Sequence, residues 1–149
     1  MTEAIVKRKA SLKSNEEILL GIDYGEHKIG LAFGRSDVVM PLKIVSAVDR
    51  DMAIKEIIQI AKTNHVTKLV IGLPLSFDKK ENAQSKAVRQ FTKLLNHYLK
   101  LPFEFIDEYG TSDDAQGYLV LTGATKNRRE MDDAVAAALI LKRYYNNKA

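Results

Sequence analysis

The sequence predicts one α/β domain with a mixed five-stranded sheet flanked by helices. Three observations lead to this fold class. Three short apolar segments follow one another through tight polar turns, which is the pattern of an antiparallel meander. After them, apolar segments alternate with amphipathic helical segments, an order that requires parallel strands in the same sheet. The chain has 149 residues, 46% hydrophobic and 28% charged, which is the size and balance of a single globular domain.

The N-terminal region separates into a tail and the opening meander. Residues 1–17 are polar, mixed in charge and without periodicity, so we interpret them as a flexible tail and residues 18–149 as the folded domain. The segments ILLGIDYG, IGLAFGR and VVMPLKIV have the apolar runs and flanking turn residues of strands. They are expected to form three antiparallel strands.

The second half of the domain alternates between helices and strands. Apolar residues recur at helical spacing in residues 49–65 and 81–99, which predicts two amphipathic helices. The segments KLVIGLPL and FEFIDE are predicted to be buried strands. A further helix is expected at TSDDAQGYLVL, then a basic loop at TGATKNRRE, and a final alanine-rich helix that opens at Asp132 and Asp133.

Composition excludes several kinds of chemistry. The chain has no cysteine, so disulfides and thiolate zinc sites are excluded, and ligands must be oxygen or nitrogen. No apolar run approaches the roughly 18 residues needed to cross a bilayer, and the first residues lack the apolar stretch of a secretory signal. We therefore expect a cytoplasmic protein with no membrane partner. The net charge of +4 weakly favours polyanionic partners.

Acidic residues stand where open α/β sheets bind ligands, at the carboxyl ends of the strands. Asp23 ends the first predicted strand, Asp107 and Glu108 end the last, and Asp132 and Asp133 open the final helix. Carboxylates gathered at one place repel unless a cation lies between them, and hard oxygen ligands select Mg²⁺ or Mn²⁺. The alternative is structural, because single acids at such positions often form turns or cap helices.

Four segments together resemble the YqgF family, also called RuvX. They are GIDYGEHKIGLAFG, VIGLPLSFDKKENAQSKAVRQF, FIDEYGTSDDA and DDAVAAALILKRYY, and the resemblance covers about residues 18 to 145. It implies a ribonuclease H-like fold with an acidic triad that binds metal and carries catalysis, here Asp23, Glu108 and Asp133. Asp133 is preferred to Asp132 because the apolar residues that follow then take the family's spacing.

The resemblance also directs attention to substrate contacts. In the glycine block we assign them to Gly25, His27 and Lys28, while simple turn geometry remains the alternative for the glycine. Much of the family has arginine after the acidic pair, whereas this chain has Tyr109. The basic loop is predicted to supply the missing phosphate contact, through Lys126, Arg128 and Arg129.

One further departure concerns the loop after Pro74, where the family commonly has a glycine-containing turn. The segment SFDKKENAQS has no glycine, so we expect a loop of different shape. Lys79 and Lys80 within it, like the N-terminal tail, are the alternative places for phosphate contacts.

The function implied by the resemblance is a metal-dependent nuclease that matures the precursor of small-subunit (16S) ribosomal RNA. A Holliday junction resolvase acting on four-way DNA is the first alternative, and a nucleic-acid-binding or ribosome-associated protein with little turnover is the second. Phosphoryl transfer is a third, because the glycine block also resembles the phosphate loop of sugar and acetate kinases. Those kinases bind ATP between two such domains and this chain has one, so a kinase would need an intimate dimer. The expected partners are structured RNA, branched DNA and ribosomal precursor particles, with the chain as a monomer or homodimer.

Overall fold

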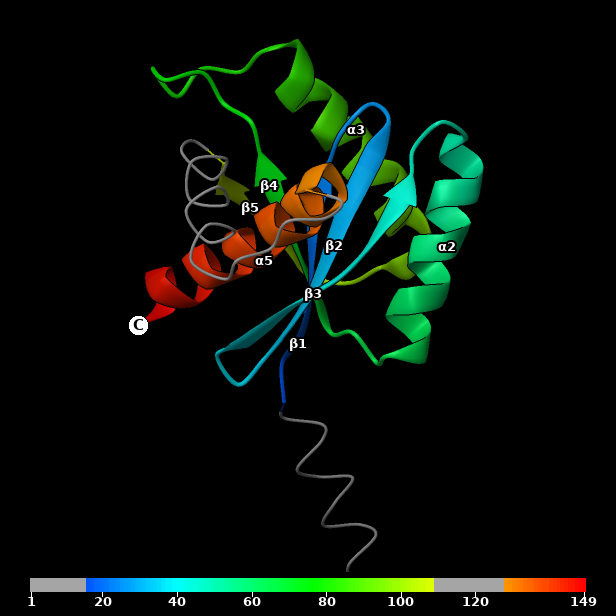
Figure 1. Ribbon diagram of the computed structural model, residues 1–149, viewed down its shortest axis with the longest axis vertical. Helices are drawn as coiled ribbons and strands as arrows, with labels where there is room; N and C mark the ends of the chain where they lie inside the picture. The colour runs from blue at the N-terminus through cyan, green and yellow to red at the C-terminus, as the bar shows by residue number, and fades with distance from the viewer. Residues whose placement is uncertain (1–15, 109–127) are drawn as a thin grey trace, which may run out of the picture.

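A computed structural model describes residues 16–108 and 128–149, with side chains from residue 134 onward in the second stretch. Figure 1 shows the elements in order. They are β1 (Ile18–Tyr24), β2 (Lys28–Arg35), β3 (Val38–Ser46), α2 (Arg50–Thr63), β4 (Lys68–Leu73), α3 (Ala83–Leu99), β5 (Phe103–Asp107) and α5 (Arg128–Lys148).

The five strands form one sheet in the order β3-β2-β1-β4-β5. β1 pairs antiparallel with β2, and β2 pairs antiparallel with β3, so the predicted meander is confirmed. β4 runs parallel to β1 and β5 runs parallel to β4, so the mixed sheet is also confirmed. Because Leu73 is the register partner of Asp107, the carboxyl ends of the last two strands lie at the same edge of the sheet.

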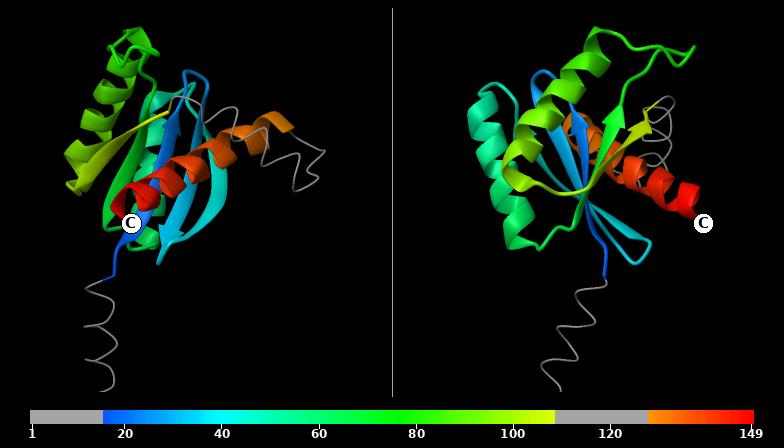
Figure 2. Two further views of the ribbon diagram at one scale, coloured as in Figure 1. Left: turned by 90° about the vertical axis from the view of Figure 1, so that its left-hand side faces the viewer. Right: turned by 180° about the vertical axis from the view of Figure 1, so that it is seen from behind.

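Helices cover both faces of the sheet. α2 and α3 lie on one face and α5 crosses the other, as the views in Figures 1 and 2 agree. Side chains alternate along each strand, so Leu20 and Ile22 of β1 join the core under α2 and α3, whereas Leu19 joins the core under α5. The two cores therefore share the same strands and fix the position of α5 against the sheet.

α5 packs unusually close to the sheet because small residues meet at the contact. A Cβ atom added at Gly21 would lie 2.7 Å from Cγ of Leu141 and 2.9 Å from the carbonyl oxygen of Ala137. A Cβ atom added at Gly34 would lie 2.9 Å from the hydroxyl oxygen of Tyr145. Glycine in these strands thus serves a close approach of the helix backbone rather than a turn.

The start of α5 corrects two of our expectations. The helix begins at Arg128, so Arg128 and Arg129 belong to its first turn and not to a loop before it. Asp132 and Asp133 consequently lie inside the helix instead of opening it. Arginine, glutamate and methionine are good helix formers, so the segment RREM extends the helix backwards past the acids. Lys126 and the helix expected at residues 111–121 lie outside the described residues.

Glu16 and Glu17, within the stretch interpreted as a tail, contact the domain. Nε of Arg35 lies 2.5 Å from Oε1 of Glu16, and the hydroxyl of Tyr144 donates to Oε1 of Glu17 at 2.5 Å. Residues 1–15 lie outside the described part of the chain. None of the helices in the described ranges combines the length and apolarity that a membrane span requires.

Candidate functional site

Two of the predicted acids converge at the carboxyl edge of the sheet. Asp23 lies near the end of β1 and Glu108 directly follows β5, and the side chain of Glu108 hydrogen-bonds to that of Asp23. The backbone of Glu108 is held in place because its N–H donates to the carbonyl of Leu73 at 3.1 Å. Of the three acids expected to converge, two therefore meet, Asp23 and Glu108.

A glycine in β4 makes this meeting possible. β1 and β5 are not neighbours, since β4 lies between them, so the side chain of Glu108 must pass over β4 to reach Asp23. It passes at Gly72, where an added Cβ would lie 2.6 Å from Cγ of Glu108 and 2.5 Å from Cδ1 of Ile140. Any larger residue at this position would occupy the space of the glutamate.

The environment of Glu108 opposes its negative charge. Burial and the adjacent Asp23 raise the pKa of Glu108 to about 10, and Asp107 adds to the effect. The positive charge of Arg143 acts in the opposite direction but is outweighed. Without metal, Glu108 therefore carries a proton at neutral pH, and a bound cation would take the place of that proton.

Two basic side chains border the acids. The guanidinium of Arg143, from α5, donates through Nη1 to the carbonyl oxygen of Asp107 at 2.8 Å. Nζ of Lys79, from the loop between β4 and α3, pairs with the carboxylate of Asp107. These contacts hold positive charge at the end of β5, beside the acids.

The loop between β4 and α3 obtains its turn without glycine. Lys79 adopts a left-handed backbone with φ of 65°, and its N–H donates to the carbonyl of Ser76 at 2.8 Å. Asn82 caps α3 and also donates through its side chain to the carbonyl of Pro74 at 2.8 Å, which closes the loop. A lysine thus occupies a conformation that favours glycine, and its ammonium group is brought to Asp107.

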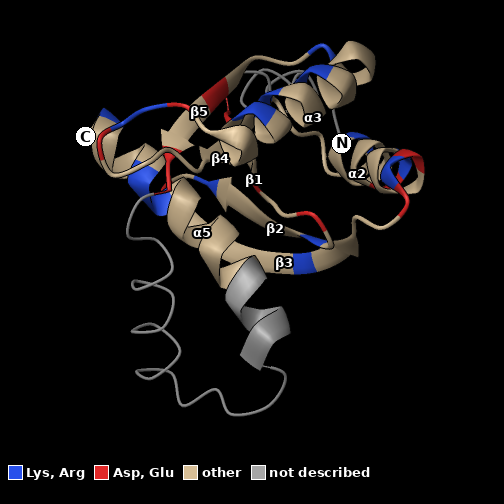
Figure 3. Cartoon of the chain, turned by 90° about the horizontal axis from the view of Figure 1, so that it is seen from above, with Lys and Arg blue, Asp and Glu red and all other residues tan. Residues whose placement is uncertain are grey.

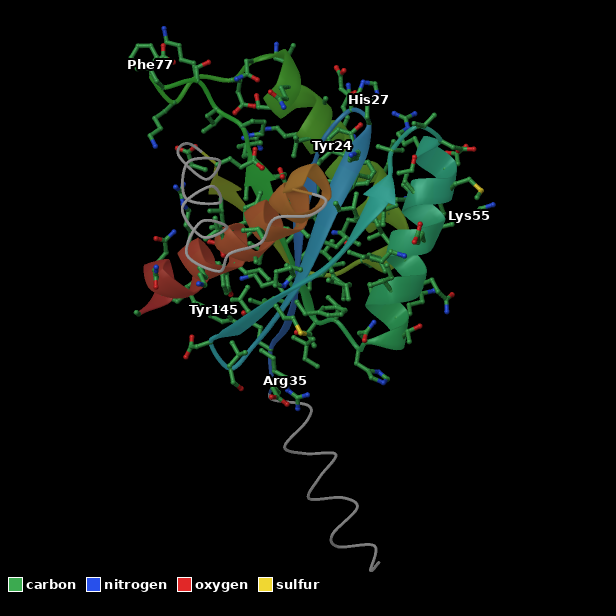
Figure 4. All side chains as sticks on the ribbon, viewed as in Figure 1. Tyr24, His27, Arg35, Lys55, Phe77 and Tyr145 are labelled. Atoms are coloured by element: carbon green, nitrogen blue, oxygen red, sulfur yellow. The ribbon has the colours of Figure 1, made fainter. Side chains whose placement is uncertain are left out.

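The hairpin between β1 and β2 lies at the same end of the molecule. The N–H of Gly25 donates to the carbonyl of Lys28 at 2.9 Å, and an added Cβ at Gly25 would lie 2.8 Å from that oxygen. Turn geometry therefore accounts for this glycine. His27 and Lys28 are exposed, and Figure 4 shows His27 at the end of the molecule where Phe77 also lies.

The third predicted acid, Asp133, lies within α5, and its side chain is outside the described part of the structure. Among the side chains of residues 16–108 and 134–149, no three His, Cys, Asp or Glu groups gather closely enough to share a metal ion.

Sequence reasoning missed Gly72 and Arg143. The signal for Gly72 was a lone glycine within the apolar strand KLVIGL, which often marks a close approach of another group. The signal for Arg143 was its spacing, three residues after Ile140 on a helix that faces the sheet.

The sheet order, the helix across one face and the acid pair at the carboxyl edge define a domain of the ribonuclease H-like fold class. Solved structures share this fold: RuvC of T. thermophilus in complex with a Holliday junction substrate has a TM-score of 0.58 at 14% identity and covers 89% of this chain and 97% of RuvC. The Fowlpox virus resolvase bound to Holliday junction DNA has a TM-score of 0.54 at 10% identity, with 88% and 97% covered. The predicted fold class is confirmed.

The chain belongs to the family described as RuvX, Holliday junction resolvase, which it matches over residues 17–147. Relatives named "Putative pre-16S rRNA nuclease" include a protein of Orientia tsutsugamushi, 37% identical, with 88% of this chain and 87% of the relative covered. Others come from Bordetella parapertussis, 38% identical with 87% and 93% covered, and Chloroflexus aurantiacus, 32% identical with 87% of each covered. The predicted family is confirmed, and with it a hydrolase acting on phosphodiester bonds.

Proposed function

We propose that the chain is a divalent-metal-dependent nuclease that cuts structured RNA and matures the precursor of small-subunit ribosomal RNA. The observation that carries the proposal is the convergence of Asp23 and Glu108, reached across β4 at Gly72. A contact between two carboxyl groups that raises the pKa of one of them to about 10 is unfavourable for stability alone, which supports a functional role. The printed names of the relatives support ribosomal RNA precursor as the substrate.

The donor set fits Mg²⁺ or Mn²⁺, because it consists of carboxylate oxygens and the chain has no cysteine. We assign the metal-binding roles to Asp23, Glu108 and Asp133. Asp133 precedes Ala137 by four residues and Ile140 by seven, so its position falls on the stripe of α5 that contacts the sheet. When bound, the metal would supply an activated water and stabilisation of the leaving oxygen.

Basic residues would bind the substrate phosphates around these acids. We assign this role to Arg143, which the structure holds at the end of β5, together with residues predicted from the sequence. These are His27, Lys28, Lys126, Arg128 and Arg129, and Gly25, required by the turn, would also let the phosphate backbone come close. Much of the family has an arginine where this chain has Tyr109. Arg143 of α5 is suited to take over its role, because its positive charge acts on Glu108.

Four-way DNA is the second candidate substrate, favoured by the description of the family. Incubation of the protein with labelled precursor RNA and with junction DNA, with and without Mn²⁺, separates the two. We expect metal-dependent cleavage of the RNA and none by Glu108→Gln, which keeps the size of the side chain and removes its charge. Preferential cutting of the junction would assign the DNA activity, and binding without cutting of either would identify a protein with little turnover. A cytoplasmic location and the choice between monomer and homodimer remain predictions.

The sequence-predicted basic set has its own test. Replacing Lys126, Arg128 and Arg129 together by alanine should weaken RNA binding and make it depend less on salt. A protein that contacts fewer phosphates releases fewer counterions from the RNA when it binds. For a duplex the log–log slope should fall by roughly 0.9 per contact. Affinity is measured at several salt concentrations, and turnover at saturating substrate is measured separately. Identical slopes in wild type and variant would assign these residues to solvated surface and leave Arg143 and Lys79 as the phosphate contacts.

A further inference from the structure

α3 carries a basic stripe along one exposed face. Its members are spaced by three or four residues, and all are exposed: Lys86, Arg89, Lys93, His97 and Lys100. Residues 83–100 contain no aspartate or glutamate. In Figure 3 α3 accordingly shows blue segments and no red. Spacings of three and four residues place Lys86, Arg89, Lys93 and His97 on one side of the helix, where they present one positive surface, and Lys100 follows as the C-cap.

Most of this charge has no acidic partner. Arg89 pairs in a bidentate manner with Glu81, at 2.8 and 3.1 Å. Within the described residues, no carboxylate lies within ion-pair distance of Lys86, Lys93 or Lys100. Arg89 and, more weakly, Lys86 lower the pKa of Glu81, but one carboxylate balances only part of the charge of this row. The excess of cations favours a polyanion as partner.

A groove with an aromatic wall runs beside the stripe, between α3 and β5. It encloses about 590 Å³, and its basic rim consists of Arg89, Lys93 and His97. Its wall contains Phe103 and Phe105, whose rings meet edge to face with centroids 5.5 Å apart. The guanidinium of Arg89 lies 4.9 Å from the ring centroid of Phe105, and Phe103 remains 47% exposed. The groove therefore offers an open ring face beside positive charge.

The groove leads away from the acid pair. β5 runs from Phe103 to Asp107 and is followed at once by Glu108, so Phe103 lies about 17 Å from the acid along the edge strand. The right-hand view in Figure 2 shows α3 in front of the sheet with β5 at its edge. A strand of nucleic acid that starts at the acid pair and passes around the edge strand β5 would reach the groove after a few nucleotides.

We propose that the groove between α3 and β5 binds the single-stranded RNA that flanks the cleaved phosphodiester. Phosphates lie along Lys86 and Lys93, and a base stacks on Phe103. The combination of cations with an exposed aromatic ring recognises unstacked bases, whereas the bases of a duplex would present no ring face to Phe103. This inference rests on the proposed function and extends it, because it adds a specificity surface outside the acid site.

The charge contribution is tested with two matched double variants. Lys86→Ala/Lys93→Ala removes two exposed lysines seven residues apart on α3, and Lys55→Ala/Lys62→Ala removes two exposed lysines seven residues apart on α2. Figure 4 shows Lys55 on α2. Binding of a labelled single-stranded RNA is followed by fluorescence anisotropy in a chelator at several salt concentrations. The α3 variant should reduce the log–log salt slope by about 1.4, since each single-strand contact contributes about 0.7, and the α2 control should leave it unchanged.

The aromatic contribution is tested with Phe103→Leu and Phe103→Tyr. Leucine keeps an apolar side chain but removes the ring, so it should weaken RNA binding roughly tenfold. Tyrosine keeps the ring and should restore wild-type affinity. Circular dichroism and thermal melting of both variants establish that the fold is retained.

Three results would overturn the proposal. Equal salt slopes for the two lysine pairs would do so, as would equal binding by Phe103→Leu and wild type. The third is a homodimer that Phe103→Leu converts to a monomer in sedimentation, which would make the groove a subunit contact. Cleavage of precursor RNA with Mn²⁺ is assayed in parallel. Normal cleavage with equal slopes rejects the groove alone, whereas absence of cleavage and of RNA binding by wild type rejects the proposed function as well.

Discussion

Acids stand at both ends of the parallel strands, but their surroundings differ. At the amino end, Nζ of Lys68 lies 3.4 Å from Oε2 of Glu104 and donates to the hydroxyl of Tyr144 at 3.1 Å. Tyr144 donates in turn to Glu17, and Lys148 lies 3.5 Å from Oε1 of Glu104. Burial lowers the pKa of Lys68, yet its bonds to Tyr144 and Glu104 outweigh burial and raise it. Charges there are balanced by partners within the chain.

At the carboxyl end the side chain of Glu108 is hydrogen-bonded to another acid, Asp23, while Asp107 pairs with Lys79. Burial and Asp23 raise the pKa of Glu108 to about 10 even though Arg143 is close by. The same sheet thus contains a cluster of opposite charges at one end and a contact between two carboxyl groups at the other. A contact between two carboxyl groups that raises the pKa of Glu108 this far indicates where the function lies.

The largest expected effect is the loss of cleavage in Asp23→Asn. The substitution removes a metal-binding charge without changing the size of the side chain, so cleavage should fall by about 10³-fold or more. The metal-free protein should gain stability, by about 0.5–2 kcal/mol, because the repulsion with Glu108 is relieved. Activity on precursor RNA and thermal melting in a chelator measure both. An unfolded variant, or one that cuts normally, would contradict the assigned role.

The next effect comes from Gly72→Ala. The added methyl group would displace Glu108 and Ile140, which should destabilise the fold by about 1–3 kcal/mol and reduce cleavage more than stability alone explains. Gly21→Ala is the matched control, because it presses on Leu141 and Ala137 in the same helix contact but not on the acids. Cleavage per folded molecule is compared at a temperature where both variants are folded. Equal cleavage by the two variants would show that Gly72 serves packing only.

These substitutions also show which parts of the molecule the sequence could predict. The periodicity of residues 18–108 predicted every described strand and both helices between them, since apolar spacing directly reflects burial on a face. The sequence also predicted that Asp23 and Glu108 lie at one edge of the sheet. Each of these acids stands at the end of an apolar segment and shortly before a glycine, which is typical of the end of a strand.

What could not be predicted depends on distances between elements. The path of Glu108 over Gly72 depends on β4 lying between β1 and β5, and the reach of Arg143 to Asp107 depends on how α5 crosses the sheet. The predicted start of α5 lies too late in the chain. Asp132 and Asp133 are typical of the first turn of a helix, but good helix formers precede them and extend the helix back to Arg128.

The third prediction concerns the pH dependence of stability without metal. The pKa of Glu108 is about 10 in the folded protein and near its ordinary value of 4.5 in the unfolded chain. Between these values the folded state holds the extra proton, so the contribution of Glu108 to the free energy of unfolding is full below about pH 4.5 and declines as pH rises towards 10. Denaturant unfolding in a chelator should show this decline, and Asp23→Asn should reduce it. A wild-type curve equal to that of Asp23→Asn would contradict the repulsion.

The smallest effect is expected at the balanced end, in Tyr144→Phe. The change keeps the buried ring and removes only the hydroxyl that joins Lys68 to Glu17. Because both former partners retain access to water or to another partner, the loss should be about 0.5–1.5 kcal/mol of stability, with cleavage unchanged. Asp23→Asn should do the reverse, gaining stability and losing cleavage. Measuring melting and turnover for both variants in one buffer therefore tests the difference between the two ends directly. If Tyr144→Phe lowered turnover tenfold while the fold stayed intact, the amino end would be coupled to the acid site, and its balanced charges would have a role beyond stability.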